Sequence, residues 1–403
     1  MSKMVFSAAD ILLPADGNYE TWAVVACDQF TSEPDYWARV DRTVADNPST
    51  LRMILPEAQL SDGHTKEHIA IINETMMEYD SQNIFREYPD AMIYLERIQS
   101  DGKIRKGLIG KIDLEEYDYS PDSSSAVRAT EGTVLDRIPP RQAVRRNAPL
   151  ELPHIMLLAD DPENKLIGPL AKCSQLLYDC DLMEGGGHVK GFLLTKAQQE
   201  AVQKALAELA QAPVLFAVGD GNHSLASAKA HYEEEKAKGL ASAQLSRYAL
   251  VEVVNLYDDA LEFEPIHRVL FDIDPADVMK ELKNYYPETD TGQGEGHVIR
   301  YACAGIEGYL TVPDPQAQLE VGTLQRFLDD YIAKKGCRID YIHGDEVALE
   351  LGKKRGNIAF LLPAMDKHDL FRSIAADGPL PRKTFSMGHA QDKRYYIEAR
   401  KIK

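Results

Sequence analysis

The chain has 403 residues, of which 44% are hydrophobic and 27% charged, and its formal net charge is −19. This length and composition predict a globular protein of two or three domains with a large buried core. The negative charge argues against binding to nucleic acids or anionic membranes, and five cysteines without C-x-x-C spacing argue against structural zinc. Because we find no apolar run of membrane-spanning length and no secretory signal pattern, we expect a cytoplasmic protein.

A short apolar stretch near the N-terminus, Thr21–Cys27, predicts a buried strand. Asp28 follows it directly, and a carboxylate at the end of a buried strand is a common position for a site residue. An Asx turn explains the same aspartate equally well, so both interpretations stay open.

The next elements carry stronger local signals. The apolar spacing over Lys66–Asp80 predicts an amphipathic helix. Ala91–Gln99 and Lys103–Asp113 predict two strands of one sheet, and the Ser100-Asp101-Gly102 turn between them indicates a hairpin.

An arginine-rich segment follows in this otherwise acidic chain, with arginines at Arg128, Arg137, Arg141, Arg145 and Arg146. Pro140 suits the first turn of a helix, which would place Arg141 and Arg145 on one face. Like charges at that spacing repel unless an anion lies between them, and guanidinium groups clamp phosphate or carboxylate well. We therefore favour an anion-binding role, with internal ion pairs to Glu131 and Asp136 as the alternative.

The middle of the chain alternates strands and helices. Leu152–Leu158 and Val189–Leu194 predict strands, and Thr195-Lys196-Ala197-Gln198 is a capping box that opens a helix.

A strand, a helix and a strand then follow within about 40 residues. Val214–Val218 predicts the first strand, the residues from His223 predict the helix, and Arg247–Leu256 predicts the second strand. This order predicts a βαβ unit with two parallel strands and a right-handed crossover.

From about Phe271 the chain predicts a smaller α/β region. We expect strands at Val298–Ala302, Gly308–Val312, Ile339–His343, Asn357–Leu362 and Arg394–Ala399, and helices at Val321–Lys335, Glu346–Lys354 and Met365–Ala375. The chain thus divides into three expected regions, residues 1–150, 151–270 and 271–403.

The turn Gly219–Ser224 (GDGNHS) combines more chemistry than any other stretch. Its glycines let backbone N–H groups turn toward a ligand, and a helix N-terminus favours an anion. Asp220 and His223 add an oxygen ligand or base and an imidazole. The turn lacks the spacing and lysine of a P-loop and the third glycine of the dinucleotide-binding fingerprint. The alternative is that Asp220 and Asn222 only form the turn and cap the helix.

The order of strand, Asp-Gly-x-His and helix resembles the D-G-H-H-R signature of the ParB/sulfiredoxin-like nucleotide-binding fold, which includes free serine kinases. The chain differs from that signature at Asn222 and at Ser224, where the signature has an arginine. Further segments, among them Leu114–Arg141 and Leu361–Gly388, resemble the bacterial family catalogued as domain of unknown function 1015 over almost the whole chain. The resemblance implies a mixed α/β (α+β) fold with a ParB/sulfiredoxin-like βαβ core and a nucleotide site at the turn.

These observations lead us to expect nucleotide-dependent phosphoryl transfer to a small polar metabolite, with a serine-like hydroxy acid as the first expectation. Mg²⁺ with ATP or ADP is the expected cofactor. The expected catalytic residues are Asp220, His223 and Asp28, and Asp220 is also the expected metal ligand. The residues expected to bind the nucleotide are Gly219, Gly221, Asn222, Ser224, Arg128, Arg137 and Arg141.

Two other functions fit the same residues. One is a phosphatase or nucleotide hydrolase, and the other is a non-catalytic nucleotide-gated switch. Sulfiredoxin-like redox chemistry is disfavoured because no cysteine lies in or beside the turn. The expected partners are a nucleotide and a small-molecule substrate, without nucleic acid or membrane, and a homo-oligomer is compatible with the sequence.

Overall fold

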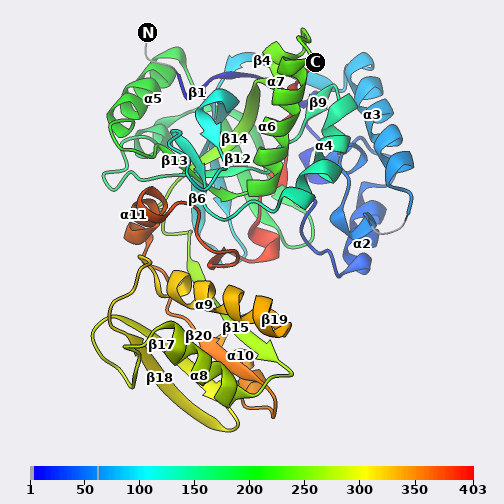
Figure 1. Cartoon of the computed structure of the whole chain (residues 1–403). Coiled ribbons are helices and arrows are strands. Elements are labelled where there is room, and N and C mark those ends of the chain that lie inside the picture. The colour runs from blue at the N-terminus through cyan, green and yellow to red at the C-terminus, as the bar shows by residue number, and fades with distance from the viewer. Residues whose placement is uncertain (1–3, 61–62) are drawn as a thin grey trace. The chain divides into compact units, whose positions relative to one another are not determined.

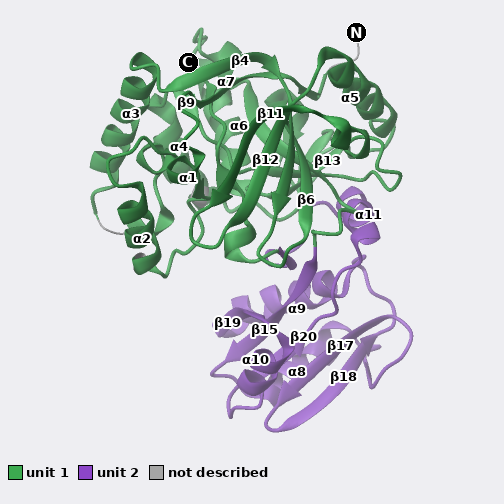
Figure 2. Cartoon of the chain, turned by 180° about the vertical axis from the view of Figure 1, so that it is seen from behind, with its two compact units in different colours: residues 1–261, 388–403 green, residues 262–387 purple. Residues whose placement is uncertain are grey.

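The computed structural model describes residues 4–60 and 63–403, and the chain divides into two compact units (Figure 2). Unit 1 comprises Met1–Leu261 together with Gly388–Lys403, and unit 2 comprises Glu262–Met387. The boundary expected at residue 150 is not a division between compact units, because strands from both sides of it pair in one sheet. The boundary expected at residue 271 lies close to the observed start of unit 2, but the last residues of the chain belong to unit 1.

Unit 1 is built on a mixed sheet that has ten strands among the described residues. Its hydrogen-bonded order is β11 (Gln175–Leu182), β12 (Gly187–Leu193), β5 (Ile93–Ile98), β6 (Ile104–Asp113), β14 (Tyr248–Asn255), β10 (Met156–Ala159), β13 (Phe216–Asp220), β8 (Val127–Ala129) and β7 (Tyr117–Asp118), with β1 (Phe6–Ser7) on β6. The pairs β10–β14, β13–β8 and β7–β8 are parallel, and the other pairs are antiparallel. The expected mixed α/β architecture is confirmed.

The expected hairpin is confirmed as β5 and β6. Ile98 pairs with Ile104 at its end, and Gly102 adopts a φ of 83° in the turn, a conformation that glycine tolerates without a steric penalty. Alternate residues of β5 pack into different hydrophobic clusters, with Ile93 and Leu95 in one and Tyr94 in the other. Both faces of the sheet are therefore covered.

The expected βαβ unit is wrong in its strand direction. β13 and β14 are joined through α6 (Asn222–Ala237) and α7 (Ala243–Ser246), but β10 lies between them in the sheet. Because β10 is antiparallel to β13 and parallel to β14, those two strands run in opposite directions. Local sequence indicates a strand, a helix and a second strand. It does not indicate the direction of the second strand, or that β10 pairs between β13 and β14, because both depend on distant parts of the chain.

The remaining helices of unit 1 are α1 (Tyr19–Trp22), α2 (Pro34–Val44), α3 (Thr65–Ser81), α4 (Ile138–Asn147) and α5 (Lys196–Leu209). The 3₁₀ helices are η1 (Thr50–Met53), η2 (Glu57–Gln59), η3 (Leu114–Glu116), η4 (Leu135–Arg137), η5 (Gly168–Lys172) and η6 (Ala390–Asp392). The expected helix over Lys66–Asp80 is confirmed as α3, and the capping box of Thr195 and Gln198 is confirmed at α5. α4 packs alongside α6 (Figure 1). None of the described helices combines the length and the apolar character that a membrane span requires.

Short strand pairs attach the C-terminal segment, residues 388–403, to the rest of unit 1. β22 (Tyr395–Tyr396) pairs with β3 (Val24–Val25), and β23 (Arg400–Lys401) pairs with β9 (Leu150–Glu151). The single strand expected over Arg394–Ala399 is therefore wrong, as is the strand expected over Thr21–Cys27, which is the end of α1 followed by β3. Short apolar runs of this kind suit helix and strand alike, so periodicity does not separate them. A further pair joins β2 (Ala9–Pro14) to β4 (Phe85–Ala91).

Unit 2 has its own sheet, in which the pairs among the described residues are antiparallel. Its order is β16 (Asp290–Thr291), β18 (Ile306–Val312), β17 (His297–Cys303), β20 (Ile358–Leu361), β15 (Phe263–Phe271) and β19 (Arg338–His343), with β21 (Phe385–Met387) on β15. Its helices are α8 (Pro275–Tyr285), α9 (Glu320–Lys335), α10 (Asp345–Gly352) and α11 (Lys367–Asp377). The expected hairpin is confirmed as β17 and β18, and the three helices expected in this region are confirmed as α9, α10 and α11.

Candidate functional site

The turn from β13 into α6 is shaped by two glycines. Gly219 has no partner on β10, since Val218 pairs with Leu157 and Asp220 pairs with Met156, so the strand bulges at this position. Gly221 adopts a φ of 81°, and a Cβ there would lie 3.1 Å from the Cα of Ile155. A residue with a side chain would therefore meet both backbone strain and a close contact.

Asn222 holds the turn against the end of β8. Its Oδ1 accepts a hydrogen bond from the N–H of Thr130 at 3.2 Å, and its Nδ2 donates to Thr130 Oγ1 at 3.1 Å and to the carbonyl of Val218 at 3.3 Å. The side chain is buried. Its amide is thus engaged within the protein, and any ligand contact at this position falls to the backbone.

Asp220 ends β13 with a partly shielded carboxylate. Its Oδ1 accepts a hydrogen bond from the N–H of Gly221 at 2.9 Å, and its Oδ2 lies 3.3 Å from Nζ of Lys393. About a fifth of each side chain remains exposed, 21% for Asp220 and 18% for Lys393. The pair is therefore accessible to a small ligand while its members are held in place.

The start of α6 provides positive electrostatic potential. The N-cap residue of this 16-residue helix is Gly221, which has no side chain to cap it, so the macrodipole and the first N–H groups favour an anion there. His223, the second residue of the helix, accepts a hydrogen bond at Nε2 from the N–H of Val134 at 3.2 Å. That bond requires an unprotonated Nε2 and leaves the hydrogen of a neutral ring on Nδ1.

Asp28 lies close to the same lysine. Burial would raise the pKa of its carboxyl, but His154, a hydrogen bond from Gln29 Nε2 at 3.0 Å and the charge of Lys393 hold the pKa below its ordinary value. Asp28 is therefore ionised at neutral pH. Two of the residues expected to be catalytic, Asp28 and Asp220, thus share Lys393 as an electrostatic partner.

A chain of hydrogen bonds runs from the turn to the C-terminal segment. Ser224 Oγ lies 3.1 Å from Nε2 of His154, and Nδ1 of His154 lies 2.7 Å from the hydroxyl of Tyr396. That hydroxyl also accepts a hydrogen bond from the N–H of Cys27 at 3.3 Å. We call Ser224, His154 and Tyr396 the polar relay, since a proton on either imidazole nitrogen is compatible with these contacts.

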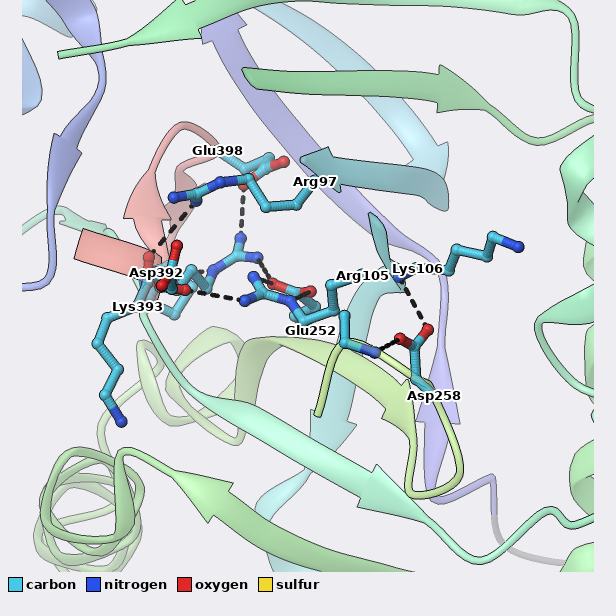
Figure 3. A network of polar contacts seen from close by, with 11 residues as sticks. Arg97, Arg105, Lys106, Glu252, Asp258, Asp392, Lys393 and Glu398 are labelled. Atoms are coloured by element: carbon cyan, nitrogen blue, oxygen red, sulfur yellow. Dashed lines mark hydrogen bonds and ion pairs between the residues drawn. The ribbon is translucent and has the colours of Figure 1, made fainter. Parts of the chain in front are cut away.

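The C-terminal segment is fixed by a buried network of charges (Figure 3). Arg394 Nη1 contacts Glu252 Oε2 at 2.8 Å, and Arg105 Nε contacts Glu252 Oε1 at 3.2 Å. Asp392 accepts hydrogen bonds from the N–H and the hydroxyl of Ser100, both at 2.7 Å. The side chain of Lys393 extends away from this network in Figure 3, and in the structure it reaches Asp220.

Local sequence did not indicate His154, Tyr396 or Lys393. His154 interrupts an otherwise apolar run, and a single polar residue in such a run was the available signal. Lys393 and Tyr396 reach the turn from more than 170 residues away in sequence, so no spacing pattern connects them with Asp220.

The arginine-rich segment contributes to two different places. Arg141 forms an ion pair with Glu57, and Arg145 Nη2 lies 2.5 Å from Glu151 Oε2; both arginines line a cavity that Ser224 also lines. These partners differ from the expected Glu131 and Asp136.

Arg128 lies elsewhere: its guanidinium donates to the carbonyls of Ser125 at 3.0 Å and Pro213 at 3.1 Å. Arg137 lies on η4, and its side chain lies outside the described part of the structure. Among the arginines of this segment whose side chains are described, Arg141 and Arg145 lie at the cavity beside the turn.

The comparisons with known proteins define a family. The sequence profile of the family described as protein of unknown function (DUF1015) matches residues 10–399, so the chain belongs to this family. No curated protein matches the chain.

Solved structures with a distant likeness include a mutant form of a free serine kinase in complex with ADP. It is 11% identical, with a TM-score of 0.42, and the match covers 74% of this chain and 93% of that one. SbnI with C-terminal truncation from Staphylococcus aureus is 12% identical, with a TM-score of 0.39 and coverage of 70% and 82%.

Proposed function

We propose that this protein is a nucleotide-dependent phosphotransferase that acts on a hydroxylated small molecule. The most direct support is the place of Lys393 between two carboxylates. Its ammonium group contacts Asp220 at the start of α6, and its charge helps to lower the pKa of Asp28. Phosphoryl transfer requires positioning and charge stabilisation more than covalent chemistry. A lysine, an uncapped helix N-terminus and two carboxylates are groups suited to that task.

The phosphates of the nucleotide would bind at the N-terminus of α6, where the first N–H groups of the helix favour an anion and Ser224 offers a hydroxyl. Lys393 would neutralise their charge, in the role that the sequence assigned to Arg128, Arg137 and Arg141. His223 would contact a phosphoryl oxygen through its ring.

Mg²⁺ would enter with the nucleotide. Among the described residues there is no cluster of three or more side chains suited to hold a metal ion. Mg²⁺ keeps several waters and is commonly bound by one or two carboxylates together with phosphate oxygens, so Asp220 alone is compatible with that mode. The ion would supply charge neutralisation between the phosphates.

The acceptor hydroxyl would lie near Asp28 and the polar relay. As the bond between its oxygen and phosphorus forms and the bond from phosphorus to the leaving oxygen breaks, its proton would pass to the ionised carboxylate of Asp28. The nucleotide leaves with one phosphate fewer. The sequence led us to expect a serine-like hydroxy acid as the acceptor.

Phosphorus NMR tests this proposal. The protein is incubated with Mg²⁺ and ATP, ADP or CTP against a panel of hydroxylated compounds. We expect a new phosphomonoester signal that appears together with the shortened nucleotide. Free phosphate without an ester would indicate the hydrolase alternative, and binding without turnover would indicate the nucleotide-gated switch. Neither binding nor turnover with any nucleotide would refute the proposal.

A further inference from the structure

Unit 1 contains a cavity of about 160 Å³, partly open to solvent, beside the candidate site. Its wall is mainly apolar, and includes Met53, Leu55, Leu60, Met76, Val144 and Ile155. A dry cavity of similar volume in another protein, about 150 Å³, accommodates benzene. The space is thus suited to a group of about six carbon atoms.

The charged side chains along the wall neutralise one another. Arg141 pairs with Glu57, and Arg145 pairs with Glu151, which Arg400 also contacts at 2.7 Å, so the charged groups along the wall are engaged with partners in the protein. A fully polar ligand would lose its hydration against the apolar part of the wall, where no side chain offers a hydrogen bond in return. The wall therefore favours an apolar body.

One end of the cavity is polar. Ser224, His154 and Tyr396, the three members of the polar relay, all line it. His154 also acts electrostatically on Asp28. A hydroxyl group held by the relay would therefore lie near the carboxylate that accepts its proton and near the start of α6.

From this geometry we infer the acceptor class: an alcohol whose body is an apolar group of about benzene size, bound in the cavity with its hydroxyl on the polar relay. This inference rests on the proposed function for the transfer step, but the binding it describes does not require catalysis. The expected acceptor is therefore no longer a compact polar molecule such as serine, but an alcohol whose affinity comes from burial of its apolar body in the cavity.

Binding of a homologous series tests the inference without nucleotide. Ethanol, butanol, hexanol, octanol and benzyl alcohol are titrated against the full-length protein by saturation-transfer NMR. Each buried methylene is expected to tighten binding about fourfold until the cavity is full, near hexanol. Benzyl alcohol should bind at least as well as butanol. Affinity independent of chain length would overturn the inference.

Two variants locate the binding. Val144→Phe fills the cavity and should weaken hexanol at least tenfold, whereas the same change at the exposed Val347 in unit 2 should have no effect. Leu60→Ala enlarges the cavity and should extend the gain in affinity to octanol, which provides a readout if the phenylalanine variant does not fold. Unchanged hexanol binding in a folded Val144→Phe protein would overturn the inference.

Nucleotide binding separates this inference from the proposed function. If the protein binds ATP with Mg²⁺ but its affinity for alcohols does not depend on their chain length, the proposed function stands and the inference about the acceptor is wrong. If the protein binds the alcohol series in the cavity but neither binds nor turns over any nucleotide, the proposed function is wrong and the alcohol site stands.

Discussion

Two adjacent residues, Lys393 and Arg394, lie in regions where charged side chains differ in exposure. Lys393 belongs to the candidate site, and Arg394 belongs to the buried network. Arg394 enters the buried network, where its side chain is 3% exposed and contacts both Glu252 and Glu398. Lys393 extends away from this network (Figure 3). It contacts Asp220, and about a fifth of each of these two side chains is exposed. Charges that fix the chain are thus sealed and paired, whereas charges that we assign to a ligand stay accessible.

The difference has a physical basis. Removing a charge from water costs several kcal/mol, so the network must satisfy its members almost completely. Burial would raise the pKa of Glu252, but Arg105 and Arg394 hold it below its ordinary value, and the carboxylate stays ionised. At the site, incomplete pairing leaves room for a phosphate or a cation to replace a partner. Substitutions in the network should therefore affect stability, and substitutions at the site should affect ligand binding and turnover.

The largest effect is expected for Glu252→Ala. The change leaves the guanidinium groups of Arg105 and Arg394 buried without their shared carboxylate, so we expect a loss of about 3–5 kcal/mol in the free energy of unfolding. Urea denaturation followed by circular dichroism measures it. Glu307→Ala, which breaks partly exposed pairs in unit 2, serves as the control and should cost at most about 1 kcal/mol. Equal losses in the two variants would contradict the contrast between sealed and accessible charges.

Asp220→Asn should reduce turnover or Mg²⁺-dependent nucleotide binding about 10²–10³-fold while the melting temperature stays close to that of the parent. Asparagine retains the acceptor for the N–H of Gly221 and removes the charge that a divalent ion requires. His223→Gln should act in the same direction.

Asp118→Asn is a matched control for Asp220→Asn, because Asp118 also ends a strand and accepts a backbone hydrogen bond, from Ser120 at 3.0 Å. Its activity should equal that of the parent protein. If the Asp220 variant were instead less stable and fully active, the turn would be structural.

Much of the fold could be predicted where the signal is local. The β5–β6 hairpin depends on one turn, the start of α5 on one capping box, and α3 and α9 on apolar periodicity. The insertion of β10 between β13 and β14 could not be predicted in this way, because it depends on which of several equally apolar strands pair. The return of residues 388–403 to unit 1 likewise depends on Arg394 and Asp392 meeting partners that are 142 and 292 residues away.

In the candidate site, too, the sequence indicated the residues that have a local signal and missed those that come from distant parts of the chain. The turn and Asp28 stood out because each follows a short apolar run, and the structure places both near Lys393. Their catalytic role stays a prediction. Asn222 illustrates the limit of residue type as a guide: its amide suits a ligand, but Thr130 and Val218 engage it.

Lys393→Met should weaken nucleotide binding about 10–30-fold, because the phosphates would lose their nearest proposed cation. Lys401→Met, also in the C-terminal segment and also removing an ion pair, is the control and should bind nucleotide normally. Isothermal titration calorimetry at low and high salt measures both. An identical affinity for the parent protein and Lys393→Met would exclude Lys393 from the site and remove the main support for the proposed function.

The smallest effect concerns His231, a buried residue of α6 whose ring belongs to neither region. Its two ring nitrogens have no hydrogen-bond partner among the described residues, although Oε1 of Glu235 lies 3.5 Å from Nε2. Burial, reinforced by the charge of Arg145 and opposed by Glu235, lowers the pKa of His231 to about 4 from 6.5. The unfolded chain therefore binds a proton at a higher pH than the folded chain.

The sign of the pH dependence follows from that difference. The contribution of His231 to stability is fully present above pH 6.5 and is lost as the pH falls toward 4, by about 1.5 kcal/mol between pH 6.5 and 5. In His231→Leu this part of the pH dependence should disappear, whereas His368→Gln, a change at an exposed histidine of unit 2, should leave it unchanged. Urea denaturation at both pH values measures the difference. If the free energy of unfolding of His231→Leu fell as much between pH 6.5 and 5 as that of the parent protein, His231 would not contribute to the acid sensitivity. Another titratable group would then have to account for it.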